Sequence, residues 1–353
     1  MKKILFLIMS VFLAFTFALS GCSCEADVYL EFENALTTNI KTETLVYDVE
    51  YQDNYKGIAC AKPVNKDLIP QYNGTLTIEY NGSGKPLPSG VPQHVKFDGI
   101  TTFNYIKSVL SLDVVIDGKT YNDKIISEVY FFDAEWAFAP VYSKTTVKNT
   151  FIAMSLSKIG IDQKIYEYTT LYKNDKFTLT KKYYKPDENE DVNGVDIENL
   201  DQTKMKALTG NGSSNEYEKR KAIDNVQLLF IARNLNLKKG KSETIPTITY
   251  MYEEAKDILI KNHSESSTVL GELNYNGTIK TDVNIPVKNM LLAIDGAEHV
   301  GSTKYVSLQK DVVGDIENYA LPIEYAESII ENHSFNTIGA LVYKLKSVNI
   351  TTK

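Results

Sequence analysis

The stretch LDVVIDGKTYNDKIISEVYFF, residues 112–132, decides the fold class. Residues 112–116 and 124–132 are rich in Val, Ile, Tyr and Phe, which favour the pleated, half-buried surface of a strand. Asp117-Gly118 lies between them and is typical of the tight turn that joins two antiparallel strands. The stretch therefore predicts a β-hairpin.

The same pattern recurs on both sides of this hairpin. In residues 44–51, Leu45, Tyr47, Val49 and Tyr51 share one parity, which predicts a strand with one buried face. Residues 81–84, Asn-Gly-Ser-Gly, predict a turn. Further strands are predicted at 71–80, 138–147, 165–184 with a break at 173–175, 244–252, 257–261, 271–275 and 277–287, and a closing hairpin at 321–330 and 338–349. By propensity, residues 251–261 could instead form a helix.

One helix is predicted in the mature chain, at residues 224–233. Asp224 can cap its start, and Val226, Phe230 and Arg233 follow at helical spacing. Leu228 and Ile231 add apolar surface on another side, which predicts a buried helix. Arg233 is one of only two arginines in a chain where lysine is otherwise used. Because guanidinium groups suit planar, bidentate partners, Arg233 is expected to join the helix end to a carboxylate or to backbone carbonyls of the sheet.

Residues 186–218 differ from the rest and are interpreted as a polar, solvated insertion or linker. Within them, residues 189–194 carry oxygen donors at alternate positions and a glycine at the sixth, as in a calcium loop. Leu200 stands at the twelfth position, where such a loop needs a bidentate carboxylate. Two readings of residues 187–198 stay open, a weak calcium site and a solvated acidic loop.

The first residues are typical of an export signal. Lys2 and Lys3 precede an apolar run at 4–19, which is shorter than the roughly 20 residues that span a bilayer. Leu19-Ser20-Gly21-Cys22 then resembles a bacterial lipobox, and the resemblance implies that Cys22 is lipidated and begins the mature chain. We expect a signal peptide at 1–21, a lipidated tether at 22–44 and a single β-rich domain at 45–353. The protein is then exported and anchored to the outer face of a bacterial membrane.

Charge and cysteine content limit the partners. The formal charge is -7, and loss of the two lysines of the signal makes it about -9, which disfavours nucleic acid. The nearest basic and aromatic run, at 181–185, is followed at once by acidic residues. With Cys22 lipidated, Cys24 and Cys60 are either a disulfide or two separate thiols.

The sequence resembles a family of exported bacterial proteins of unknown function. The matching pieces extend over nearly the whole mature chain: residues 45–49, Ile223-Asp224, Leu228, Phe230, residues 233–235, Lys239-Gly240, residues 321–324 and residues 339–347. The resemblance implies a curved, largely antiparallel sheet and no particular reaction. The predicted fold class is therefore mostly β, a large curved antiparallel sheet or half-barrel with one buried helix.

Candidate chemistry is sparse. His94, His263, His299 and His333 lack the close spacing of zinc ligands, so no metal site or other cofactor is predicted. No nucleophile, metalloprotease or phosphate-loop motif is present, so no catalytic residue is assigned.

Three functions remain as hypotheses. The leading one is a lipid-anchored cell-envelope protein with a non-enzymatic binding or assembly role, in which a concave face holds an apolar ligand, a glycan or an envelope protein. A second is a carbohydrate-active enzyme that uses Asp133 and Glu135, which would share one strand face beside Trp136. The third is a passive surface or structural protein without a pocket.

Overall fold

The computed structural model describes residues 40–52, 71–91, 99–133, 138–155, 158–173, 176–208, 213–216, 222–235, 237–250, 255–294, 301–307, 320–330 and 337–353. All of them belong to one compact unit, Glu31–Lys353. The predicted signal, Cys22, Cys24 and Cys60 lie outside the described residues.

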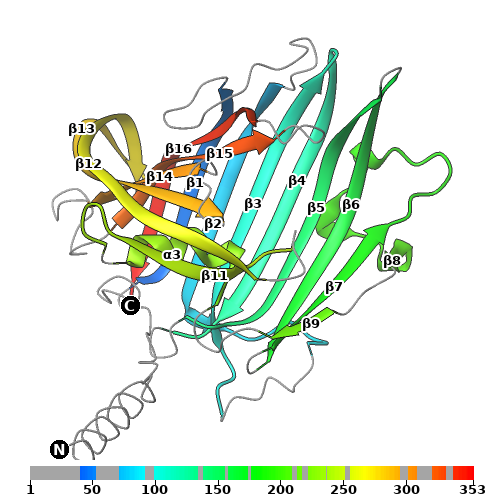
Figure 1. Cartoon of the computed structure of the whole chain (residues 1–353), viewed down its shortest axis with the longest axis horizontal. Helices are drawn as coiled ribbons and strands as arrows, with labels where there is room; N and C mark the ends of the chain where they lie inside the picture. The colour runs from blue at the N-terminus through cyan, green and yellow to red at the C-terminus, as the bar shows by residue number, and fades with distance from the viewer. Residues whose placement is uncertain are drawn as a thin grey trace, which may run out of the picture. The chain divides into compact units, whose positions relative to one another are not determined.

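A single sheet dominates this unit, and its described part has 16 strands (Figure 1). Its order is β10-β11-β12-β13-β14-β15-β16-β1-β2-β3-β4-β5-β6-β7-β8, with β9 paired to β7. Neighbours are antiparallel except β10 with β11 and a short contact of β12 with β16. The strands are β1 Ile40–Gln52, β2 Gln71–Lys85, β3 Phe103–Ile116, β4 Lys119–Phe131, β5 Pro140–Ser155, β6 Lys158–Lys173, β7 Lys176–Tyr184, β8 Met205–Ala207, β9 Ser213–Glu216, β10 Ile223–Asp224, β11 Ser242–Ile248, β12 Lys256–Tyr275, β13 Thr278–Ile294, β14 Gly301–Ser307, β15 Ala320–Ile330 and β16 Thr337–Thr352.

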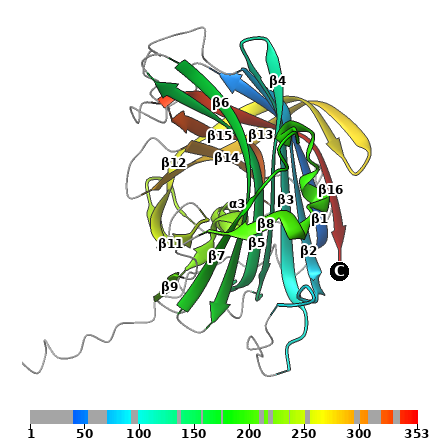
Figure 2. The ribbon, with the colours of Figure 1, turned by 90° about the vertical axis from the view of Figure 1, so that its right-hand side faces the viewer.

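The sheet is curved into a half-barrel, so the predicted fold class is confirmed. Figure 2 shows β5–β7 on one side of the curve and β11–β12 on the facing side. Ile248, at the end of β11, packs in one buried cluster with Tyr172, Phe177 and Leu179 of β6 and β7. The two ends of the sheet therefore meet through apolar side chains.

The predicted helix is confirmed as a 3-10 turn, η6 (Asn225–Gln227), that leads into α3 (Leu228–Asn234). Asp224 accepts from the backbone N–H of Val226, and Gln227 completes the capping box by accepting from the N–H of Asp224. The cap fixes where the helix begins, so Phe230 and Arg233 are directed at the sheet.

Phe230 places the helix against the concave side of the half-barrel. Its ring packs against Tyr80 of β2, Phe131 of β4 and Phe138, with ring centroids 4.9, 5.5 and 5.4 Å away. We call this side of the sheet the inner face. Because side chains alternate along a strand, Leu45, Tyr47 and Val49 of β1 share it, as predicted.

Arg233 has the planar partner predicted for it. Its Nη1 and Nη2 atoms donate to the two carboxylate oxygens of Glu43 on β1, at 3.1 and 2.5 Å. The side chains of Arg233 and Glu43 are only 4% and 2% exposed. The pair therefore joins the helix end to the middle of the sheet.

The hairpin predicted at 112–132 is confirmed, with Ile116 opposite Lys119 and positive φ angles at Asp117 and Gly118. Its first strand is longer than predicted, because β3 begins at Phe103. The turn predicted at 81–84 is wrong: β2 continues to Lys85, and the pairing with β3 shifts between Asn81 and Lys85.

The C-terminal half also has longer strands than predicted. The strands expected at 257–261 and 271–275 are one strand, β12, which forms a hairpin with β13. The turn between them has positive φ angles at Asn276 and Gly277. The closing hairpin of β15 and β16 is confirmed, whereas β14 was not predicted.

Residues 191–205 are folded onto the sheet, which differs from the solvated insertion predicted there. Asp191, Asp196 and Asp201 each cap a one-turn 3-10 helix: η3 (Val192–Gly194), η4 (Ile197–Asn199) and η5 (Gln202–Lys204). Apolar residues of this segment, among them Ile197 and Met205, form a buried cluster with Ile165 of β6 and Tyr184 of β7. The turns therefore cover the face opposite to α3, which we call the outer face.

Candidate functional site

The inner face keeps a patch of half-buried side chains in the middle of the sheet. We call six of them the inner patch, and they lie in two neighbouring rows that cross the strands. The first row includes Ile78, Ser108 and Tyr168, and the second includes Leu110, Ile125 and Tyr166. Towards α3 the inner face is closed, because Ile106, Val129 and Phe131 are buried. The inner patch is thus the part of the concave face that the helix leaves partly accessible.

Two hydroxyl residues complete the first of these rows. Ser127 of β4 lies between Ser108 and Thr145, and Thr145 donates to Ser127 at 3.1 Å. Ser127 and Thr145 are buried, whereas Ser108 is half-buried. The patch therefore offers mainly aliphatic and tyrosine surface with a short line of hydroxyl groups.

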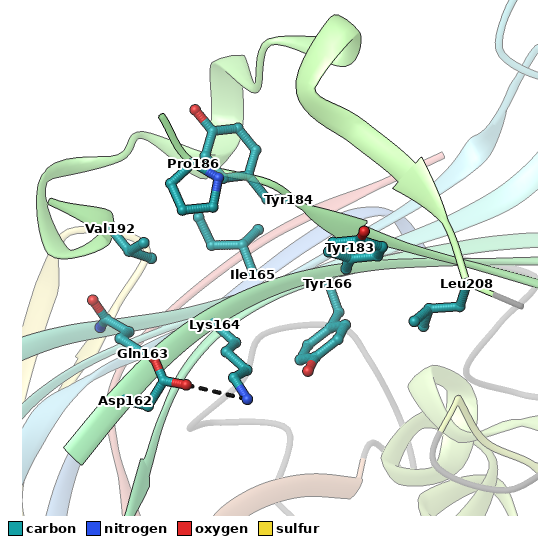
Figure 3. Close-up of a pocket in the computed structure, with 10 residues that line it drawn as sticks. All are labelled: Asp162, Gln163, Lys164, Ile165, Tyr166, Tyr183, Tyr184, Pro186, Val192 and Leu208. Carbon is teal, nitrogen blue, oxygen red and sulfur yellow. Dashed lines mark ion pairs between the residues drawn. The ribbon is translucent and has the colours of Figure 1, made fainter. Parts of the chain in front are cut away.

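A pocket of about 400 Å³ lies where β7 separates from β6 (Figure 3). We call it the tyrosine pocket, and it is lined by Asp162, Gln163, Lys164, Ile165, Tyr166, Tyr183, Tyr184, Pro186, Val192 and Leu208. Ile165 and Tyr166 leave opposite sides of β6 in Figure 3. Asp162 and Lys164 form an ion pair at 3.1 Å at one end, so the lining combines a paired charge with aromatic and aliphatic walls.

A second pocket, of about 390 Å³, has a polar lining. We call it the polar pocket, and its walls come from four adjacent strands. They are residues 73–75 of β2, residues 111–113 of β3, residues 122–124 of β4 and Lys148 of β5. Lys124 forms an ion pair with Glu198 of η4. The remaining amide and hydroxyl groups suit hydrogen bonding to a small polar molecule.

Asp123 and Lys148, the most buried charges of the polar pocket, are both held in hydrogen bonds. Asp123 accepts from the N–H and the hydroxyl of Thr150, at 2.9 and 2.6 Å, and from Gln163 at 2.9 Å. Lys148 donates to the backbone carbonyls of Asn193 and Val195, both at 3.0 Å. Burial raises the pKa of Asp123 and lowers that of Lys148, which favours the neutral form of each. Both groups therefore act as structural ties between β4, β5, β6 and η3.

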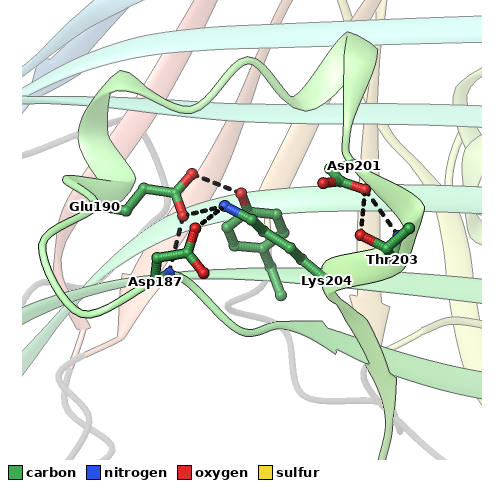
Figure 4. A network of polar contacts seen from close by, with 6 residues as sticks. Asp187, Glu190, Asp201, Thr203 and Lys204 are labelled. Atoms are coloured by element: carbon green, nitrogen blue, oxygen red, sulfur yellow. Dashed lines mark hydrogen bonds and ion pairs between the residues drawn. The ribbon is translucent and has the colours of Figure 1, made fainter.

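Two carboxylates of the acidic loop, Asp187 and Glu190, are paired with a lysine (Figure 4). The Lys204 ammonium group lies 2.7 Å from carboxylate oxygens of both Asp187 and Glu190. Side-chain hydrogen bonds from Lys204 and Tyr184 hold the pKa of Glu190 at about 2. Asp191 accepts from the N–H of Asn193, whose own side-chain oxygen accepts from the N–H of Asn122. Lys204 thus pairs with two carboxylates of the acidic loop, and the side-chain oxygens of Asp191 and Asn193 accept from backbone N–H groups.

Of the residues in the hydrolase hypothesis, the structure describes only Asp133. Asp133 is exposed, and its backbone carbonyl accepts from the N–H of Phe138 at 3.0 Å. Glu135 and Trp136 lie outside the described residues, so the enzyme hypothesis stays a prediction. In the described part of the chain, no three His, Cys, Asp or Glu side chains converge as metal ligands. Among the same residues there is no helix with the length and apolar character needed to cross a bilayer.

Sequence reasoning missed the pockets and the inner patch. In the sequence, Tyr183 and Tyr184 belong to a basic and aromatic run, and no motif marks Asp123 or Lys148. Pro186, directly after a strand, was the available signal for the tyrosine pocket, because proline ends strand pairing. No sequence signal shows which part of a concave face stays uncovered.

Comparisons with known proteins give a structural likeness without a family. No family model matches the chain, and no curated protein matches it significantly. Among solved structures, the chain is similar to a β-barrel-like protein of a domain of unknown function, DUF1849, from Brucella abortus. The TM-score is 0.44 at 6% sequence identity, over 89% of this chain and 99% of that chain.

Proposed function

We propose that the protein is a lipid-anchored cell-envelope protein that holds a ligand, without catalysis, on the inner face of its sheet. The observation that carries this proposal is the inner patch, where Ile78, Leu110 and Ile125 stay half-buried in the middle of a concave surface. The described residues form the tyrosine pocket and the polar pocket, whereas the hypothesis of a passive structural protein predicts no pocket.

The composition of the patch favours an apolar ligand with few polar groups. Removing apolar surface from water is worth about 25 cal/mol per Å², so a ligand that covers three half-exposed aliphatic side chains gains affinity from each. The hydroxyl of Ser108, beside the buried pair Ser127 and Thr145, offers a hydrogen bond that can fix the ligand's orientation. Such a ligand suits a protein whose lipid anchor keeps it beside a membrane.

The described acid and base groups support a binding role over a catalytic one. Asp123 and Lys148 are occupied by hydrogen bonds within the fold. Asp224 is buried, which raises its pKa, and it accepts from Tyr172 and caps η6. Each of these groups has a structural partner, so their pKa shifts follow from burial within the framework.

The anchor is part of the proposal and rests on the lipobox-like sequence that ends at Cys22. Intact-mass measurement of the protein purified from bacterial membranes tests it. We expect the mass of a chain that begins at Cys22 and carries a diacylglyceryl group. An intact Met1, or an unmodified Cys22, would refute the anchor and leave the binding proposal to be judged separately.

The binding proposal has a matched pair of test positions in β4. Ile125 and Ile126 are successive, both are half-buried, and they lie on the inner and outer faces respectively. The probe is N-phenyl-1-naphthylamine, a neutral apolar dye whose fluorescence rises when it leaves water. Ile125→Gln is expected to weaken dye binding about 10-fold or more, because the amide replaces roughly 1.5–3 kcal/mol of apolar contact.

Ile126→Gln is the control, since it makes the same chemical change on the outer face. Thermal unfolding of both variants checks that each remains folded. Equal loss of dye binding in the two variants, or no dye binding by the wild-type protein, would contradict the proposed site.

A further inference from the structure

Strand β6 has an open edge beside the tyrosine pocket. Residues 158–171 of β6 pair with β5, from Lys158 opposite Ser155 to Leu171 opposite Tyr142. On the other side β7 pairs only with residues 166–173. Among the described residues, therefore, β6 has a strand neighbour on one side only over residues 158–165.

The lining of the tyrosine pocket shows that it follows this edge. Four consecutive residues of β6, from Asp162 to Ile165, border it. Successive side chains of a strand point to opposite faces, so a space bordered by residues 162–165 touches both sides of β6, as a space along its hydrogen-bonding edge does. The pocket is thus a slot with the direction of a missing strand.

Pro186 explains why β7 does not pair with β6 beyond Tyr166. Proline has no N–H for a strand ladder and restricts the residue before it. Lys185 instead donates its N–H to the carbonyl of Lys204, which takes the chain away towards β8. The end of β7, with Tyr183, Tyr184 and Pro186, becomes a wall of the slot.

We propose that this slot binds an extended, mainly apolar peptide segment of a partner protein, which adds as a strand to the edge of β6. In strand addition, main-chain hydrogen bonds provide affinity and side-chain pockets provide specificity. The half-buried side chains of Tyr166, Tyr183 and Leu208 supply the side-chain pocket. The peptide would thus use both the backbone of β6 and the aromatic wall.

The chemistry of the slot selects this occupant. The charges of Asp162 and Lys164 are paired with each other, and a neutral segment leaves that ion pair intact. A lipid chain would fill the apolar walls but has no groups that pair with a strand edge. A peptide satisfies both the apolar walls and the strand edge. The paired charges at the edge also discourage indiscriminate strand pairing.

The test uses linear peptides displayed on phage and selected against the mature chain. Binders are made as free peptides, together with versions N-methylated at alternating residues, which keep their side chains but lose main-chain donors. We expect N-methylation to weaken binding about 10-fold or more, because several main-chain hydrogen bonds are lost. Hydrogen exchange of the amides of residues 162–165 should slow when the unmodified peptide is bound.

Leu208→Trp fills the pocket and is expected to weaken the same peptides about 10-fold or more. Ala207→Trp is its control, because Ala207 is the exposed neighbour that does not line the pocket. Because the N-methylated peptides need no variant, the proposal can be judged even if Leu208→Trp fails to fold.

Several results would overturn the proposal. Failure to select any peptide, or equal binding of the N-methylated versions, would do so. Unchanged exchange at residues 162–165 with bound peptide would do so as well. A wild-type chain that forms dimers through these amides would show that a second copy is the occupant. Tyr166 borders both the slot and the inner patch, but the inner-patch proposal is tested at Ile125, which does not line the slot, so the two proposals can fail separately.

Discussion

Replacing Glu43 by Gln should destabilise the fold strongly, because it leaves the Arg233 guanidinium buried without its countercharge. Both side chains are almost fully buried, and two hydrogen bonds join them across the inner face. Breaking a buried ion pair by removing one partner typically costs about 3–5 kcal/mol. That is a large share of the roughly 5–15 kcal/mol by which most domains are stable.

A matched control lies on the same strand. Glu50 pairs with Lys344, but the side chains of this pair are 48% and 50% exposed. Exposed ion pairs contribute about 0–1 kcal/mol, so Glu50→Gln should change the free energy of unfolding by less than about 1 kcal/mol. The assay is urea unfolding followed by circular dichroism at pH 7.

A double variant separates the charge from the packing. Glu43→Leu with Arg233→Met removes both charges and keeps apolar volume, and we expect it to be more stable than Glu43→Gln. If Glu43→Gln and Glu50→Gln have equal unfolding free energies, the helix is not held to the sheet by this pair. A double variant less stable than Glu43→Gln would lead to the same conclusion.

Two further predictions follow from local geometry. Gly339→Ala should destabilise the protein by about 1–3 kcal/mol in the same unfolding assay, because a Cβ at Gly339 would lie 2.3 Å from the Tyr51 ring. Gly271→Ala is the control and should have a much smaller effect, because a Cβ there would have nothing within 4 Å. Equal effects of the two substitutions would contradict the packing at Tyr51. Lys204→Met should raise the pKa of Glu190 from about 2 towards its ordinary value, as followed by NMR titration of the carboxyl carbon. Because that pKa is lowered in the folded state, its stabilising effect is present above the ordinary glutamate pKa and is lost as the pH falls towards 2. A Glu190 titration that does not change in Lys204→Met would contradict the network.

Local chemistry made parts of the fold predictable from sequence. Asp117-Gly118 sets a tight turn through its own backbone preferences, and Asp224 caps a helix through a side-chain hydrogen bond two residues away. The partner of Arg233 was also predictable in kind, because a buried guanidinium needs a planar acceptor. Its identity as Glu43, 190 residues away, depends on the folded sheet.

Other elements were missed where the periodicity is weak. The first half of β3 has apolar residues on both faces, such as Ile106 and Leu110 inside and Tyr105 and Val109 outside, so it lacks a clear alternation. The turns at 191–205 repeat an aspartate every fifth residue, which matches neither a strand nor an α-helix. Because the segment is rich in acidic residues, its sequence predicts a solvated insertion, although its apolar residues pack on the outer face.

The candidate sites were less predictable than the fold. Alternation along β3 and β4 shows that Leu110 and Ile125 share a face, but the curvature of the sheet and the position of α3 decide that they stay half-buried. The tyrosine pocket depends on where β7 stops relative to β6, which is a property of strand register. Both features arise from contacts between distant segments.

The most direct test of the proposed function is to locate the ligand by isoleucine methyl NMR. The spectrum is recorded while N-phenyl-1-naphthylamine is added to the mature chain. We predict that the methyl signals of Ile78 and Ile125, in the inner patch, shift with the dye concentration, while those of Ile126 and Ile197, on the outer face, do not. Shifts confined to the outer-face residues, or a spectrum that does not change with saturating dye, would contradict a ligand site on the inner face.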